Sequence, residues 1–158
     1  MIVGSIKEDL TLEKRIALTP ETAKNIIALG LGVCVEKNYA KHLGIDDKEY
    51  KEAGAEIKDT SKDVLNCSKL LAIVNCPAEN LMENLKENSI LIGMLNPSKN
   101  EKSINFILKR NVKTFSLELL PRITRAQSMD VLSSQSNLAG YRAVIESIYE
   151  FEKAIPMM

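Results

Sequence analysis

The sequence has 158 residues, in which 21 Lys and Arg balance 21 Asp and Glu, and 45% of the residues are hydrophobic. This length suffices for one domain or one compact lobe, because a catalytic domain plus a complete dinucleotide-binding domain would need roughly 100–150 residues each. The zero net charge and the absence of long basic runs exclude nucleic acid as an expected partner. No apolar stretch reaches the roughly 18–20 residues that span a bilayer, so we expect a cytoplasmic protein.

The cysteines and the single histidine argue against redox, zinc and hydrolase chemistry. Cys34, Cys67 and Cys76 lack C-x-x-C spacing, and two of them lie within apolar runs, which favours buried thiols. His42 lies in a polar loop without an obvious second ligand, which favours a structural role. None of the seven glycines forms a G-x-G-x-x-G turn, so a phosphate-binding loop is not expected.

Short β-branched runs alternate with longer segments of helical periodicity, which is typical of parallel strands joined by crossover helices. Thr19 and Pro20 are typical of a helix start and Gly30 of a helix end. In chain order, we expect a strand at 1–6, a helix from Pro20 to Gly30, a strand at 31–35, a short helix at 46–53, a strand at 69–74, an amphipathic segment at 78–86, a strand at 90–95, a helix capped by Ser98 that continues to Lys109, and a strand at 112–116. The expected fold class is therefore α/β: a doubly wound, mostly parallel sheet with flanking helices, a Rossmann-like or flavodoxin-like lobe without the glycine-rich turn.

The pattern changes after the last of these strands. Residues 118–137 have neither strand alternation nor a long apolar stripe, and they concentrate hydrogen-bonding side chains, so we expect a polar loop. Loops that follow the carboxyl ends of strands are where open α/β sheets bind ligands. The following segment, from residue 138 to near Lys153, has apolar residues at helical spacing, and we expect its Tyr141 to lie in the core. We therefore divide the chain into an α/β lobe at 1–137 and a helix within 138–158.

Two segments carry a family resemblance. Residues 13–22 read EKRIALTPET, and residues 118–144 read ELLPRITRAQSMDVLSSQSNLAGYRAV. Together they resemble the N-terminal region shared by alanine dehydrogenases and the alpha subunit of proton-translocating NAD(P) transhydrogenase. The first segment is common to both families, and the second is closer to the transhydrogenase form.

The resemblance implies part of the NAD(H)-binding component of a transhydrogenase, in which the full complex couples hydride transfer between NAD(H) and NADP(H) to proton translocation. It implies a Rossmann lobe, in the same subunit or in a separate chain, with NAD(H) in the cleft between the two lobes. It also implies a beta subunit that holds NADP(H), contact with the inner face of the cell membrane only through partner subunits, and a homodimer in the complete assembly. The isolated chain would then be inactive.

The resemblance also implies roles for four residues. In the family, a loop of this pattern reaches the nicotinamide end of NAD(H), and the matching residues here are Arg122, Gln127, Asp130 and Ser133. A nicotinamide carboxamide offers donors and an acceptor that these side chains can meet. The structural alternative is an ion pair between Arg122 and Asp130, with the serines as turn and cap residues.

Two positions separate the two families. Alanine dehydrogenases are expected to carry a substrate-binding lysine and a catalytic histidine where this chain has Ile73 and Asn96. An oxidative deaminase without these groups could not hold pyruvate or move its proton, which disfavours that activity. Arg15 corresponds to a substrate-binding arginine in those enzymes and is equally compatible with a structural role. The alternatives to a transhydrogenase component are an alanine-dehydrogenase-like oxidoreductase lobe and a non-catalytic fragment or assembly module.

Overall fold

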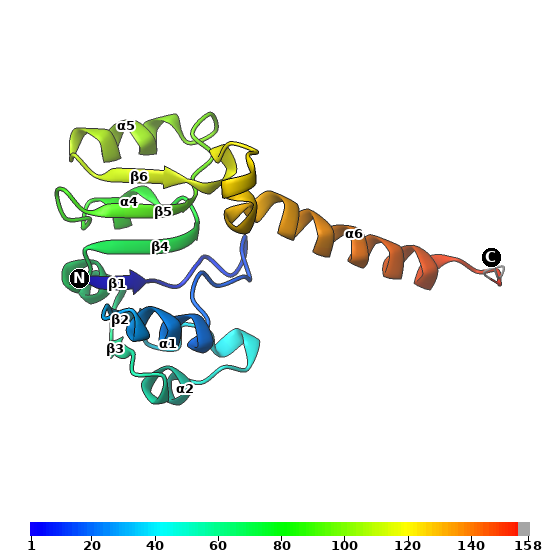
Figure 1. Ribbon diagram of the computed structural model, residues 1–158, viewed down its shortest axis with the longest axis horizontal. Coiled ribbons are helices and arrows are strands. Elements are labelled where there is room, and N and C mark those ends of the chain that lie inside the picture. The colour runs from blue at the N-terminus through cyan, green and yellow to red at the C-terminus, as the bar shows by residue number, and fades with distance from the viewer. Residues whose placement is uncertain (155–158) are drawn as a thin grey trace. The chain divides into compact units, whose positions relative to one another are not determined.

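The computed structural model describes residues 1–154, which divide into a first unit that ends at Ser116 and a second unit that begins at Leu117. The first unit is a six-stranded, all-parallel sheet with the order β3-β2-β1-β4-β5-β6 (Figure 1). This arrangement confirms the predicted doubly wound α/β class. The strands are β1 (Ile2–Ser5), β2 (Gly32–Glu36), β3 (Glu56–Lys58), β4 (Leu70–Asn75), β5 (Ile90–Met94) and β6 (Lys113–Ser116).

Helices connect these strands and cover both faces of the sheet. Because neighbouring side chains of a strand point to opposite faces, Val33 and Val35 of β2 belong to one apolar cluster and Cys34 to another. The cluster with Val33 and Val35 includes buried residues of the α-helices between β1 and β3. The cluster with Cys34 includes buried residues of the α-helices between β3 and β6. The helices are α1 (Pro20–Ala28), the 3-10 turn η1 (Lys41–Leu43), α2 (Asp47–Glu52), α3 (Ser61–Cys67), α4 (Glu79–Met82) and α5 (Glu101–Lys109).

The ends of α1 follow from its sequence. Thr19 caps the helix, because its hydroxyl oxygen accepts a hydrogen bond from the backbone N–H of Thr22 at 3.1 Å, and Pro20 occupies the first turn. Gly30 follows the helix with a φ of 82°, a left-handed conformation that favours glycine. These observations confirm the predicted start and stop signals.

The start of α5 differs from the prediction. The helix begins at Glu101 with Asn100 as its N-cap, and Ser98 does not cap it. A turn occupies the preceding residues, since the carbonyl oxygen of Asn96 accepts hydrogen bonds from the N–H groups of Lys99 and Asn100 at 2.9 and 3.0 Å. The side chain of Asn100 donates back to the carbonyl of Leu95 at 2.8 Å, which closes this turn.

Besides the 3-10 turn η1, a strand and a helix of the first unit were not predicted. The strand β3 has three residues and one apolar side chain, so it shows no alternation, and it lies at the edge of the sheet. The helix α3 has seven residues, and its two fully buried side chains, Val64 and Leu65, are adjacent in sequence. Elements this short contain too few apolar side chains to show a periodic pattern in the sequence.

The second unit contains two 3-10 turns, η2 (Leu117–Leu119) and η3 (Thr124–Met129), and the helix α6 (Val131–Glu150). The predicted loop at 118–137 is therefore wrong in its second half, since α6 begins seven residues before residue 138. The helix also ends at Glu150, before Lys153. The expected start at 138 overlooked Asp130, whose side chain caps the helix by accepting from the N–H of Ser133. Residues 155–158 of the predicted 138–158 segment lie outside the described residues.

The helix α6 has no buried residue along its length. The prediction that Tyr141 lies in the core is wrong for this chain, because 70% of its surface is exposed. The apolar periodicity was real, but nothing within residues 1–154 covers the side chains that form it. Within that same range, none of the helices combines the length and the apolar character that crossing a membrane requires. The exposed apolar side chains of α6 are Leu132, Leu138, Tyr141, Val144, Ile145, Ile148 and Tyr149.

Candidate functional site

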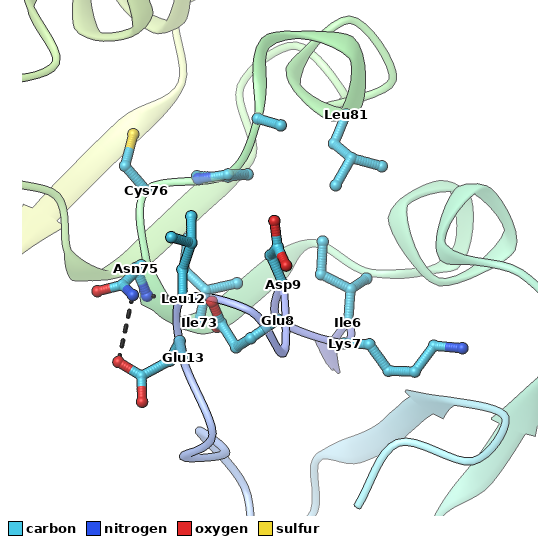
Figure 2. Close-up of a pocket in the computed structure, with 12 residues that line it drawn as sticks. Ile6, Lys7, Glu8, Asp9, Leu12, Glu13, Ile73, Asn75, Cys76 and Leu81 are labelled. Atoms are coloured by element: carbon cyan, nitrogen blue, oxygen red, sulfur yellow. Dashed lines mark hydrogen bonds between the residues drawn. The ribbon is translucent and has the colours of Figure 1, made fainter.

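A pocket of about 250 Å³ opens in the first unit beyond the carboxyl ends of β1 and β4. These strands are the central pair of the sheet. The chain adds β2 and β3 on one side of this pair and β5 and β6 on the other, and open α/β sheets bind ligands where the strand order switches in this way. The segment after β1 contributes Glu8 and Glu13, and the end of β4 contributes Ile73 and Asn75 (Figure 2).

The carboxylate of Glu8 contacts the backbone of β4 at an irregular part of the sheet. The register between β4 and β5 shifts between Ala72 and Asn75, so backbone groups there depart from the regular ladder. The carboxylate of Glu8 accepts hydrogen bonds from the N–H of Val74 at 2.7 Å and from that of Asn75 at 3.4 Å. Burial nevertheless raises the pKa of Glu8, and the negative charge of Glu13 adds to this effect.

Glu13 has the opposite electrostatic environment. Glu13 is only 8% exposed. Its Oε1 accepts a hydrogen bond from the Nε of Arg15 at 2.8 Å, and its Oε2 accepts one from the Nη2 of Arg15 at 2.6 Å. Oε2 also accepts from the Nδ2 of Asn75 at 3.2 Å, the bond drawn in Figure 2. The side-chain hydrogen bonds from Arg15 lower the pKa of Glu13 to about 2. Glu13 is therefore a permanent anion at neutral pH.

The cationic side chains near this pocket are held in ion pairs. Lys7 lies 3.0 Å from Glu36, and Arg15 is bound bidentately by Glu13. Ile73, at the position expected to match a substrate-binding lysine, contributes an apolar wall. The pocket thus presents mostly carboxylate and apolar groups, an environment that disfavours a small anionic substrate.

The connection after β1 differs from a dinucleotide-binding turn. In such folds a glycine-rich turn leads from the first strand directly into a helix and presents backbone N–H groups to a pyrophosphate. Here residues 6–19 separate β1 from α1, and this segment begins with Ile6, Lys7, Glu8 and Asp9. Two carboxylates at this position would repel a pyrophosphate.

The four residues expected to contact nicotinamide lie in the second unit. The structure brings Asp130 and Ser133 together, since the Ser133 N–H donates to Oδ1 at 3.0 Å and its hydroxyl donates to Oδ2 at 2.6 Å. The hydroxyl bond from Ser133 is the main cause of the lowered pKa of Asp130. These contacts match the cap role in the structural alternative, and they also hold the two polar side chains in a fixed mutual geometry.

Arg122 and Gln127 are exposed, and Gln127 lies on η3, immediately before the cap of α6. Among the causes of the lowered pKa of Asp130, the positive charge of Arg122 is the smallest. The ion pair between Arg122 and Asp130 that the structural alternative proposes is not among the ion pairs of residues 1–154. Outside this site, the Nε2 of His42 lies 2.7 Å from the carbonyl oxygen of Lys14, consistent with the predicted structural role.

The pocket residues Glu8 and Asn75 were not predicted as site residues. Both lie where a strand of the predicted sheet ends, and the position alone could have indicated them, because the carboxyl ends of parallel strands meet at one edge. What the sequence could not indicate is that these two residues, which are 67 positions apart, share a hydrogen bond across the pocket.

The strand order defines a Rossmann-like α/β lobe, in which a segment at residues 6–19, and not a glycine-rich turn, leads from β1 into α1. The profile of the family described as "Alanine dehydrogenase/PNT, N-terminal domain" matches residues 4–139, and the chain belongs to this family. A Rickettsia prowazekii protein named as the first part of NAD(P) transhydrogenase subunit alpha is 40% identical over 162 residues, which cover 100% of this chain and 42% of that protein.

Solved structures agree with this assignment. The crystal structure of transhydrogenase from Sinorhizobium meliloti matches with a TM-score of 0.92 at 40% identity, over 100% of this chain and 47% of that one. An L-alanine dehydrogenase shares the fold with a TM-score of 0.71 at 20% identity, over 75% of this chain and 32% of that one. The predicted family resemblance is thus confirmed, and the chain spans less than half the length of these relatives.

Proposed function

We propose that this chain is part of the NAD(H)-binding component of an NAD(P) transhydrogenase. The observation that carries the proposal is the 40% identity to a transhydrogenase alpha-subunit protein across the whole chain, including residues 118–144. The relatives are more than twice as long, which is consistent with a second, NAD-binding lobe in the same subunit or a separate chain. In the proposed function a beta subunit holds NADP(H), and the full complex couples hydride transfer to proton translocation. The complete assembly is a homodimer that meets the membrane through its partner subunits.

In this proposal the second unit orients the nicotinamide ring. The Ser133 hydroxyl donates its proton to Asp130, so its lone pairs remain available to accept from the N–H₂ of a carboxamide. The exposed Gln127 amide can donate to the carboxamide oxygen, and Arg122 can donate to a carbonyl or steady the segment. The hydride transfer itself is the chemistry of the two nicotinamides, which the protein only has to align.

The pocket at β1 and β4 supports this function over oxidative deamination of alanine. A deaminase needs a cation for the substrate carboxylate, and here Lys7 and Arg15 are paired with Glu36 and Glu13. Direct transfer between two nicotinamides requires neither that cation nor a proton relay.

The proposal is tested by reconstituting the chain with its Rossmann lobe and beta subunit and following hydride transfer from NADH to an NADP analogue. Replacing Gln127 by Ala removes one orienting hydrogen bond and should lower the rate on the order of tenfold, the equivalent of about 1–2 kcal/mol. Ser128→Ala, on the next residue of η3, is the matched control and should change the rate little. A loss of less than about threefold for Gln127→Ala would contradict the assignment.

Asp130 requires a different substitution because it also caps α6. Asp130→Asn preserves the cap, since Asn and Asp are equally favourable at this position, while it removes the negative charge. We expect unchanged helicity by circular dichroism together with slower hydride transfer. Turnover of pyruvate and ammonium by the reconstituted wild-type protein would instead favour the alanine-dehydrogenase-like alternative.

A further inference from the structure

The spacing of the cysteines argues against redox chemistry, but two of them, which are 33 residues apart in sequence, meet inside the first unit. The Sγ of Cys34, on β2, lies 2.8 Å from the Sγ of Cys67, the last residue of α3. Both are free thiols. Cys76 follows β4 and lines the pocket described above, so it belongs to a different region of the same unit.

The two thiols differ in their access to solvent. Cys34 is completely buried, whereas Cys67 is half-buried and lines a surface groove together with Lys58, Asp63 and Asn66. The Cys67 Sγ also lies 3.3 Å from the carbonyl oxygen of Val64, to which it donates. A small oxidant that enters the groove therefore meets the sulfur of Cys67 first, with that of Cys34 directly behind it.

The electrostatic environment supports the same order of reaction. Burial raises the pKa of Cys34, so this residue is a poor first nucleophile. The positive charge of Lys58 acts in the opposite direction on the pKa of Cys34, but Lys58 is paired with Glu56, whose negative charge raises that pKa.

We propose that Cys34 and Cys67 form an oxidisable pair that closes to an intramolecular disulfide when the protein meets a hydroperoxide. The thiolate sulfur of Cys67 attacks one peroxide oxygen, the O–O bond breaks, and the leaving oxygen takes up a proton to become water or an alcohol. Cys67 is then a sulfenic acid. The sulfur of Cys34 attacks it, the S–O bond breaks, and hydroxide leaves with the Cys34 proton as water.

The overall reaction converts two thiols and one hydroperoxide to one disulfide, one water molecule and either a second water molecule or an alcohol. A dithiol reductant reverses the disulfide step by exchange. The required motion is small, because a disulfide has an S–S length of about 2.05 Å and the sulfurs must approach each other by less than about 1 Å. The product ties β2 to the end of α3 and should raise the melting temperature of the first unit, because it constrains the unfolded chain.

The experiment treats the full chain with hydrogen peroxide and measures its intact mass and its proteolytic peptides. We expect a loss of about 2 Da, reversible by dithiothreitol, and a cross-linked peptide that contains Cys34 and Cys67. The melting temperature should rise by several degrees on oxidation. Peptide mapping of the wild-type protein needs no substitution, so it decides the question even if a buried variant folds poorly.

Three variants assign the roles of the sulfurs. Cys67→Ser should abolish the mass loss, and Cys34→Ala should stop at a sulfenic acid on Cys67 that dimedone traps. Cys76→Ser is the matched control and should form the disulfide at the rate of the wild type. A cross-link that involves Cys76, a disulfide between two chains, or unmodified Cys34 and Cys67 after Cys76 has been oxidised would overturn the proposal.

Discussion

Glu13 illustrates how a buried charge can be accommodated by a few neighbours. Its two carboxylate oxygens receive hydrogen bonds from the guanidinium and backbone N–H of Arg15 and from the side chain of Asn75. A buried carboxylate without such partners would be costly, because burial alone disfavours the charged form. Arg15, for which the sequence leaves a structural and a substrate-binding role open, is engaged by Glu13 in this structure.

The low pKa of Glu13 predicts a pH dependence of stability. Its pKa is about 2 in the folded protein against 4.5 ordinarily, so the unfolded chain takes up the proton first as the pH falls. The stabilisation is therefore fully present above about pH 4.5 and is lost between 4.5 and 2. Glu13→Gln should lower the free energy of unfolding on the order of 2 kcal/mol at pH 7 and much less near pH 3.

Urea titrations at the two pH values measure this difference. Glu87→Gln, which changes an exposed carboxylate in a surface turn, is the control and should leave the stability within about 0.5 kcal/mol at both pH values. An equal loss of stability at pH 7 and pH 3 for Glu13→Gln would mean that packing, and not charge, makes Glu13 important.

At the scale of elements, the pairing of β4 with β5 depends on a glycine. A Cβ atom added at Gly93 would meet the carbonyl oxygen of Ile73 at 2.7 Å and its Cγ1 at 2.8 Å, beside the register shift of β4. Both atoms are held in the centre of the sheet, so neither can move aside cheaply.

Gly93→Ala should therefore destabilise the first unit by about 1–3 kcal/mol, measured as a lower urea midpoint. Gly140→Ala is the matched comparison, because a Cβ at Gly140 of α6 meets no atom within 4 Å. Alanine there should increase the helicity by circular dichroism and leave the urea midpoint unchanged or slightly higher. If Gly93→Ala were the more tolerated of the two, the close approach of β4 and β5 would not limit the fold.

The elements that could be predicted from sequence are those with local signals. The Thr19-Pro20 start of α1 and the apolar runs of β4 and β5 were identified because capping residues and continuous apolar stretches act at short range. The short β3 and α3 carry too few apolar residues for such a signal, although both are needed to complete one side of the sheet. The start of α6 was missed although Asp130, a capping residue, precedes it.

The candidate site was predictable only to a limited extent, for a related reason. The residues of the second unit are predicted site residues on the basis of a family resemblance alone, and the contact of Asp130 with Ser133 is local in sequence. The pocket of the first unit depends on Glu8 and Glu13 meeting the end of β4, more than 60 positions along the chain. The periodicity of a segment does not indicate contacts between residues that are so far apart in the sequence.

For the whole molecule, the strand order suggests dinucleotide binding, but the connection after β1 argues against it. The segment at residues 6–19 lacks glycine and carries three carboxylates, Glu8, Asp9 and Glu13. We therefore expect this chain alone to bind NADH weakly, with a Kd on the order of 100 µM or weaker, because a pyrophosphate gains most of its affinity from backbone N–H groups. Calorimetry measures this, and adding the Rossmann lobe should restore tight binding. A low micromolar Kd for the chain alone would contradict the expectation.

The order of the strands also affects how the chain can fold during synthesis. The first strand made, β1, is the centre of the sheet and pairs with β2 on one side and with β4 on the other. The half made of β1, β2 and β3 can assemble once residue 58 has left the ribosome, but the other edge of β1 stays open until residue 70 follows. An open strand edge is a template for pairing with other chains. During the interval between β3 and β4 this edge of β1 can pair with other chains, and α3, which contacts both β1 and β2, is the element that emerges in that interval.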